Sequence, residues 1–317
     1  MSKDNLHQSP LVSVGIPTYN RADQLLKAVE SIIDQDYNNL EIIISDNASQ
    51  DNTENVCRKL CTEYQYIKYI KQEYNKGATF NFREVLKQSA GEYFMWLSDD
   101  DWLEHGYIKN CFSKLNNNLN YSIVSGQARY YYKNQFSNYG EVVNLLDNNP
   151  IKRIANYYQN VSDNIPLYGL MRRKQITNLP FRNTMGGDWL WVSSLAYLGK
   201  IFTCENTFIN RNKKEYVNKR NYFENISKSL NLSSFETNNP HLSIALSNFI
   251  EILYRSPVFK DVNLFRRFLL AFATSKIIIE KNVLGFSLSF KSLLSIVNNT
   301  LYRRLKLYRK VKKTIYR

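Results

Sequence analysis

The sequence is poor in the residues that build disulfide frameworks and zinc sites. Its 317 residues include only four cysteines and three histidines. The cysteines form no paired framework, which fits a reducing compartment. Cys57 and Cys61 lie four residues apart on an expected helix, but no histidine is close to them in the sequence. A structural zinc site needs four nitrogen or sulfur ligands, so a zinc protein is disfavoured.

Long apolar segments are also missing. The first ten residues are polar and lack the apolar core of a secretion signal. A membrane-spanning helix needs about 18 or more apolar residues. The longest candidate, Phe268 to Ile279, is shorter than that and contains Lys276. We therefore expect a cytoplasmic protein without spanning helices.

Glycine-rich phosphate loops are absent as well. Neither G-x-G-x-x-G nor G-x-x-x-x-G-K-[ST] follows the first expected strand, residues 11–16. A dinucleotide-dependent oxidoreductase and a P-loop enzyme are therefore disfavoured. A bound pyrophosphate would need its charge neutralised in another way, and a metal ion could do this.

What the sequence does contain is a regular alternation of strand and helix patterns. Hydrophobic residues make up 44% of the chain, which is enough for a sizeable core. Short apolar runs predict strands, and apolar residues at helical spacing predict the helices between them. The expected strands are 11–16, 40–44, 67–71 and 93–97, and the expected helices are 23–34, 53–63 and 80–89. This order predicts an α/β fold with a mostly parallel central sheet flanked by helices.

Polar residues follow each expected strand. The strand at 93–97 runs into three adjacent carboxylates, Asp99, Asp100 and Asp101. The other strand ends carry Thr18 and Asn20, Asp46 and Asn47, and Asn75 and Lys76. Such ends meet at one edge of an open parallel sheet, where ligands bind. Adjacent carboxylates suit Mg²⁺ or Mn²⁺, whereas the alternative is a solvated acidic turn that caps the next helix.

Four segments then stand in a familiar order and spacing: Val14 to Arg21, Glu41 to Asp51, Asn75 to Gly77, and Gly91 to Asp101. Together they resemble the family 2 glycosyltransferases of the GT-A fold, closely over residues 10–110 and more loosely to about 215. The resemblance implies inverting, metal-dependent transfer of a sugar from a nucleotide-sugar to an acceptor hydroxyl. The Gln-x-x-Arg-Trp motif of processive synthases is absent, which favours the addition of one sugar per event.

The resemblance also implies roles for individual residues. The implied donor-binding residues are Pro17, Thr18, Tyr19, Asn20, Asp46, Asn47, Lys76, Asp99 and Asp100. The loop after the first strand would lie against the nucleobase, although Tyr19 could instead be a core residue. Asp46 and Asn47 match the pair that reads the base, and Asp99 and Asp100 match the residues that hold the ribose and the metal. Asp100 and Asp101 are the expected metal ligands.

This sequence departs from the family pattern at two of these places. Asn47 stands where the family usually has a second acid, and because an amide can donate as well as accept, the preferred base is open. Ser98 replaces the first carboxylate of the common Asp-x-Asp pattern, so the metal site depends on Asp100 and its neighbours.

Asp188 is the candidate general base. It follows Gly186 and Gly187 and begins an apolar helical pattern, Trp189 to Leu198. An N-cap is the commoner role for such an aspartate, but inverting transfer needs one carboxylate to accept the proton of the acceptor hydroxyl. The family base is an aspartate at a helix start, usually after a glutamate, whose place Gly187 takes here. Arg211 is a further candidate, as a pyrophosphate contact.

The C-terminal part differs in composition from the rest. We expect a catalytic domain over residues 1–215 and a helical, basic region over 216–317, with amphipathic helices at 265–279 and 284–297. Residues 251–317 hold 15 Lys and Arg against 3 Asp and Glu, while residues 1–100 hold 10 against 15. The tail, 301–317, is therefore expected to bind an anionic membrane surface, at the inner face of the plasma membrane. A disordered tail, or a helix packed on the domain, is the alternative.

The expected acceptor is a glycan, and by analogy a lipid-linked glycan of a bacterial surface polysaccharide. A non-catalytic GT-A scaffold or glycan-binding subunit is the runner-up. The net charge of +14 could suggest a nucleic-acid binder, but the acidic first 100 residues oppose this. A nucleotidyltransferase fits the loop at 17–21 poorly.

Overall fold

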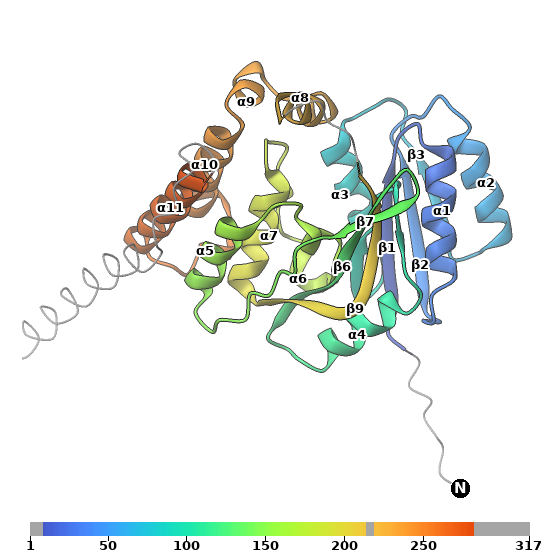
Figure 1. Ribbon diagram of the computed structural model, residues 1–317, viewed down its shortest axis with the longest axis horizontal. Helices are drawn as coiled ribbons and strands as arrows, with labels where there is room; N and C mark the ends of the chain where they lie inside the picture. Colours follow the sequence, from blue (N-terminus) through green and yellow to red (C-terminus); the bar gives the residue numbers. More distant parts are fainter. Residues whose placement is uncertain (1–8, 214–218, 282–317) are drawn as a thin grey trace, which may run out of the picture.

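The computed structural model describes residues 9–213 and 219–281, and it consists of one curled nine-stranded sheet between helical layers (Figure 1). The strand order is β3-β2-β1-β4-β8-β6-β9-β5, with β7 paired to β6. The strands are β1 (Val12–Thr18), β2 (Leu40–Asp46), β3 (Ile67–Lys71), β4 (Tyr93–Trp96), β5 (Asp101–Leu103), β6 (Tyr121–Tyr132), β7 (Gln135–Tyr139), β8 (Leu170–Arg172) and β9 (Lys200–Asn212).

The helices cover both faces of the sheet. The α-helices are α1 (Ala22–Ile33), α2 (Thr53–Glu63), α3 (Ala78–Gln88), α4 (Tyr107–Asn116), α5 (Pro150–Asn160), α6 (Arg173–Ile176), α7 (Gly187–Leu198), α8 (Lys219–Leu230), α9 (Ser234–Asn238), α10 (Pro240–Ile250) and α11 (Leu264–Ile279). Two 3-10 turns, η1 (Ile165–Tyr168) and η3 (Pro257–Phe259), and a π-helical turn, η2 (Glu251–Arg255), connect them. Buried residues of α1, α2 and α4 form one core cluster with the sheet, and those of α3, α5, α7, α10 and α11 form the other.

The parallel half of the sheet confirms the predicted alternation. β1 pairs in parallel with β2 and β4, and β2 pairs in parallel with β3. β1 is buried along its whole length, as an inner strand covered on both faces should be. Gly15 lets α3 pack close to this strand, because a Cβ atom there would lie 2.7 Å from the Val85 Cγ2. The Thr53–Glu63 helix and the Ile67–Lys71 strand have the predicted bounds.

The strands of the second half of the sheet were harder to predict from the sequence. β6 is one long strand, and it pairs in parallel with β9. The last residue of the acidic triplet begins the short strand β5, which runs antiparallel to β9. This pairing joins residues that are more than a hundred positions apart, so no local pattern indicates it.

The C-terminal helices pack onto the rest of the molecule. Ile244 of α10 and Ile277 of α11 belong to the same buried cluster as Trp191 of α7 and Ile154 of α5. The amphipathic helix expected at 265–279 is confirmed as α11. The one expected at 284–297 and the basic tail lie outside the described residues, and the domain boundary at 215/216 stays a prediction. Within residues 9–213 and 219–281, every helix is too short or too polar to span a lipid bilayer.

Candidate active site

A cleft of about 1110 Å³ opens where β1, β2 and β4 end. Residues that follow each of these strands line it, together with the start of α3, so the predicted convergence of polar strand ends is confirmed. The predicted site residues on its wall are Pro17, Thr18, Tyr19, Asn47, Asp99, Asp100, Asp101 and Arg211. Tyr19 is exposed rather than part of the core.

Asn81 of α3 holds the ends of β1 and β2 together. Its buried amide donates to the backbone carbonyls of Ser45, at 2.7 Å, and Thr18, at 3.2 Å. Asn47 then connects this floor to the loop after β3, because its side chain donates to Asn75 and accepts from the Lys76 backbone, each at 2.8 Å. The loop ends are therefore held by amide hydrogen bonds before any ligand binds.

Arg21 binds two members of the acidic triplet. Its guanidinium lies 2.9 Å from the Asp99 carboxylate and 2.7 Å from the Asp100 carboxylate. Thr18 donates a second hydrogen bond to Asp99, at 2.9 Å, and Ser98 donates to Asp100, at 2.6 Å. Burial raises the pKa of Asp99 to about 6, although Arg21 opposes this rise. The repulsion between adjacent carboxylates is thus relieved by an arginine from the β1 loop.

Asp101 lies on the other side of the triplet and pairs with Arg211 of β9. The two residues are register partners between β5 and β9, and the arginine Nε lies 2.9 Å from the carboxylate. The guanidinium also lies over the Tyr168 ring, 5.1 Å from its centroid. Burial alone would lower the pKa of Arg211, but Asp101 reverses the direction and raises it.

Asp188 is the second residue of α7 and not its N-cap, because Gly186 occupies the cap position with a φ of 68°. Asn164 donates a hydrogen bond of 2.8 Å to the Asp188 carboxylate, and Tyr157 donates one of 2.7 Å to Asn164. Burial raises the pKa of Asp188, and the bond from Asn164 opposes that rise. Asp188 itself is not among the residues that line the cleft, but its partner Asn164 directly precedes η1, whose last residue, Tyr168, lines it.

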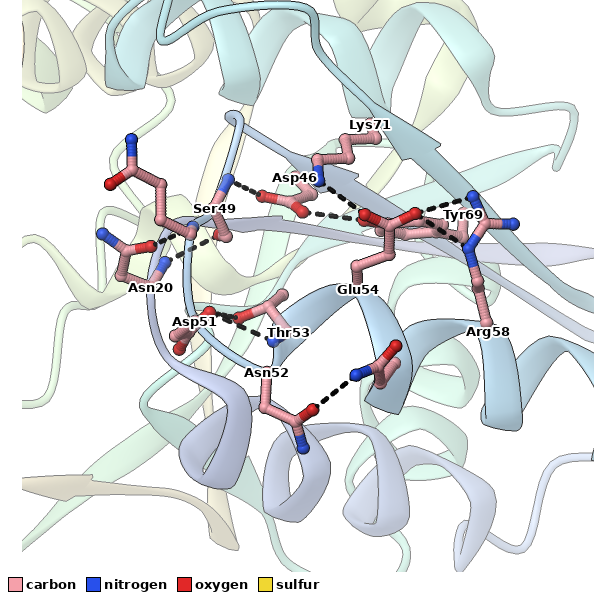
Figure 2. Close-up of polar contacts among 12 residues, drawn as sticks. Asn20, Asp46, Ser49, Asp51, Asn52, Thr53, Glu54, Arg58, Tyr69 and Lys71 are labelled. Carbon is pink, nitrogen blue, oxygen red and sulfur yellow. Dashed lines mark hydrogen bonds and ion pairs between the residues drawn. The ribbon is translucent and has the colours of Figure 1, made fainter.

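Three predicted donor-binding residues do not line the cleft. Figure 2 shows that Asp46 accepts hydrogen bonds from the Ser49 backbone, at 2.8 Å, and from the Tyr69 hydroxyl, at 2.7 Å. The Asn20 backbone, in the loop after β1, donates to the Ser49 side chain in the loop after β2. Lys76 lies over the Phe80 ring, 4.8 Å from its centroid. In this structure Asp46 and Asn20 shape the loop behind the site, and their donor-binding roles stay predictions.

Sequence reasoning missed several residues of the cleft. Arg21 was part of a motif but had no role assigned, and its position next to the triplet could have suggested one. Tyr130, Asp163 and Tyr168 line the wall opposite β1, where the Tyr130 hydroxyl donates to Asp163. α8 contributes a further rim that includes Tyr222, Asn225 and Lys228. No local signal indicated these residues, because only tertiary contacts bring them to the cleft.

The carboxylates of the cleft suit a divalent cation whose coordination shell is completed by a bound ligand. Asp100 supplies carboxylate oxygens at the wall of the cleft, and Mg²⁺ commonly takes one or two protein carboxylates together with substrate phosphates. Both carboxylates pair with an arginine, but Asp101 is only 3% exposed and Asp100 is 13% exposed, which makes Asp100 the better candidate ligand. The described residues contain no group of three or more His, Cys, Asp or Glu side chains placed to hold a metal. The phosphates of a ligand would therefore have to complete the shell.

A family model for glycosyl transferase family 2 matches residues 13–179. The chain belongs to this family. Both the resemblance and the GT-A fold that it implied are thereby confirmed. A relative from Campylobacter jejuni, named GalNAc(5)-diNAcBac-PP-undecaprenol beta-1,3-glucosyltransferase, is 41% identical over 108 residues, which are 34% of this chain and 35% of the relative. The chain thus matches about a third of that relative's length.

Two solved structures share the fold. Mannosyltransferase PcManGT from Pyrobaculum calidifontis, in complex with GDP-Man and Mn²⁺, aligns with a TM-score of 0.52 and 17% identity, over 94% of this chain and 83% of that one. Staphylococcus aureus TarS 1-349, in complex with UDP-GlcNAc, aligns with a TM-score of 0.52 and 19% identity, over 85% of this chain and 82% of that one. At these identities the likeness concerns the fold alone.

Proposed function

We propose that this family 2 chain transfers one sugar from a nucleotide-sugar to an acceptor hydroxyl, with inversion at the anomeric carbon. The observation that supports this most is the cleft at the ends of β1, β2 and β4. Its wall contains the loop residues that match the family's donor site, Thr18, Asn47 and Asp99 among them. The opposite wall comes from β6, η1 and β9, which leaves room for a second substrate.

On the donor side, we assign the loop at 17–19 to the nucleobase, Asp99 to the ribose and Asp100 to the metal. A bound Mg²⁺ or Mn²⁺ would neutralise charge on the diphosphate. Arg211 and Lys213 also line the cleft and are cationic, so they can attract the same phosphates. Arg21 already holds Asp99 and Asp100 in place and thereby orients both carboxylates before the donor arrives.

On the acceptor side, we assign the general base to Asp188. The acceptor oxygen forms a bond to the anomeric carbon while the bond from that carbon to the diphosphate oxygen breaks. The hydroxyl proton passes to the Asp188 carboxylate, and the nucleoside diphosphate leaves. A pKa raised by burial brings a carboxyl group closer to the working pH, which favours proton acceptance. Asn164 donates to one carboxylate oxygen and thereby orients the group.

The proposed acceptor is a glycan on an isoprenoid diphosphate. The name of the Campylobacter jejuni relative describes an undecaprenol-linked acceptor, and this chain matches that relative at 41% identity over 108 residues. Such an acceptor would be reached at a membrane surface. We therefore keep the basic tail as a contact to anionic lipid at the inner face of the plasma membrane.

Calorimetric titration with UDP, GDP, CDP and dTDP, each with and without Mn²⁺, tests the donor site. We expect one nucleotide to bind tightly, and only when the metal is present. If the folded protein binds none of them, the donor site is refuted and a non-catalytic scaffold becomes the better interpretation.

The substitution Asp188→Asn tests the base. It should lower the turnover rate by about 10² to 10⁴-fold, the usual contribution of a general base, while nucleotide binding stays unchanged. Asp163→Asn is the matched control, because Asp163 is a carboxylate on the cleft wall with a tyrosine partner. Loss of turnover in Asp163→Asn with normal turnover in Asp188→Asn would move the base to Asp163.

A further inference from the structure

The helix pair α10 and α11 presents an apolar surface to the outside of the molecule. We call it the outer face and define it by Leu242, Leu246, Ile250, Phe265, Phe268 and Phe272, whose exposed fractions run from 36% to 55%. Phe268 lies between Phe249 and Phe272, with ring centroids 5.8 Å and 6.4 Å away, so the two helices form one continuous surface. Figure 1 shows the pair at the edge of the molecule opposite α1 and α2. Exposed apolar patches of this kind usually mark an interaction site.

The side of the pair that faces the protein contains buried polar residues beside apolar ones such as Ile244 and Ile277. Asn248 of α10 is buried and donates to Thr274, at 2.8 Å, and to Ser275, at 3.0 Å, both on α11. Tyr158 of α5 donates to the same asparagine, at 2.8 Å. A helix pair in contact with water normally buries its apolar stripe and presents a polar outer face. The outer face is therefore built for surroundings other than water.

The charges around the outer face are mostly positive. Arg255, Lys260 and Arg266 are exposed close to it in the sequence, against the exposed acid Asp261. The chain that follows the last described residue, 282–317, contains nine Lys and Arg and no Asp or Glu. An apolar surface with a cationic border complements an anionic lipid surface, because the side chains can enter the acyl boundary while the cations meet the headgroups.

We propose that the outer face of α10 and α11 docks on the surface of an anionic lipid bilayer. A second copy of the chain fits this face less well, because residues 251–317 carry a net charge of +12 and two such regions repel each other. The docking would be additional to any contact made by the tail, and it needs no spanning helix. It would also bring the chain to the surface at which the proposed acceptor is found.

Co-flotation of the full chain with lipid vesicles tests this docking. The vesicles contain phosphatidylcholine, with or without phosphatidylglycerol. The test variant is Phe265→Ser/Phe272→Ser, and the matched control is Phe136→Ser/Tyr139→Ser, because Phe136 and Tyr139 of β7 are 51% and 50% exposed. We expect the wild type to bind the anionic vesicles, the test variant to bind at least tenfold more weakly, and the control to stay within twofold of wild type. Equal binding by the test variant would assign the contact to the tail and overturn the proposal, and so would absence of wild-type binding.

A second measurement tests whether another part of the chain covers the outer face. The variant Phe268→Cys is labelled with a maleimide, and the wild type provides the background from its own cysteines. Fast labelling without vesicles and protection by anionic vesicles are expected. Protection without vesicles would overturn the proposal, and size-exclusion chromatography would then separate a second copy from an intramolecular segment. Nucleotide titration of the same variants is independent of docking, so failure here leaves the proposed transfer untouched.

Discussion

Three consecutive carboxylates are divided between two arginines, and the two resulting clusters differ in exposure. Arg21 is 36% exposed, and its partners Asp99 and Asp100 are 8% and 13% exposed. Arg211 is 18% exposed and Asp101 only 3%, in a pair between β5 and β9. The open cluster can exchange its partners for a ligand, because water or phosphate can reach it. Separating the buried pair of Arg211 and Asp101 would leave two buried charges without partners. We therefore interpret this pair as the anchor that holds the second wall of the cleft.

The substitution Arg211→Met is expected to have the largest effect on stability. It leaves Asp101 buried without its cation, and breaking a buried pair in this way costs about 3–5 kcal/mol of unfolding free energy. Chemical denaturation measures this loss. The double variant Asp101→Leu/Arg211→Met should recover much of it, since it removes the uncompensated charge. A single variant as stable as wild type would show that the pair is no anchor.

The next effect is a pH dependence that comes from Asp99. Its pKa in the folded protein is about 6, above the roughly 3.9 of an unfolded aspartate. The folded state then holds the proton more tightly, so this stabilising contribution is present below pH 4 and is lost as the pH rises to 6. Two pKa units correspond to about 3 kcal/mol. We expect Asp99→Asn to lose less stability than wild type between pH 4 and pH 7.

Denaturant titrations at both pH values measure this difference. Asp147→Asn is a control of opposite sign, because a hydrogen bond from the Asn149 backbone lowers the pKa of this partly exposed carboxyl. Stability curves of wild type and Asp99→Asn that run parallel between pH 4 and pH 7 would contradict the assignment to Asp99.

Asp100→Ala tests whether the cluster of Arg21, Asp99 and Asp100 binds a ligand. We expect metal-dependent nucleotide binding to weaken at least tenfold, which is about 1.4 kcal/mol, because the candidate metal ligand is gone. Calorimetry with Mn²⁺ measures this effect, and titration without metal shows whether the nucleotide still has its own contacts. Undiminished metal-dependent binding would exclude Asp100 as the ligand.

Arg21→Met should have the smallest effect on stability. Arg21 itself is 36% exposed, and Asp99 and Asp100 keep their hydrogen bonds from Thr18 and Ser98, so the loss of stability should be smaller than in Arg211→Met. The pKa of Asp99 should nevertheless rise further, because Arg21 lowers it in the wild type. A loss of stability as large as that of Arg211→Met would remove the contrast between the two clusters.

The donor half of the cleft was largely predictable because its signals are local. In a parallel sheet, each strand end is followed directly by the loop that forms the site, so Thr18, Asn47 and Asp99 could be placed from the order of elements. The roles inside those loops were less predictable. Asp46 and Asn47 are adjacent, yet Asn47 lines the cleft and Asp46 is held by Ser49 and Tyr69 behind it.

The opposite wall was mostly unpredictable for a physical reason. Tyr130, Asp163 and the residues of α8 come from distant parts of the chain, and only tertiary contacts bring them to the cleft. The same holds for the outer face of α10 and α11. The helical spacing of its apolar residues showed a helix, but not which stripe would be covered by α5 and α7.

The sequence by itself determined the α/β alternation, the family and the edge of the sheet where the acids gather, because these depend on neighbours along the chain. Only the tertiary structure decided that Asp99 and Asp100 both pair with Arg21, whereas Asp101 pairs with Arg211. It also decided that Asp188 sits one residue inside its helix with Asn164 as its partner. Which arginine pairs with which carboxylate depends on the distant side chains that lie beside the triplet. The packing of the whole sheet determines the positions of those side chains.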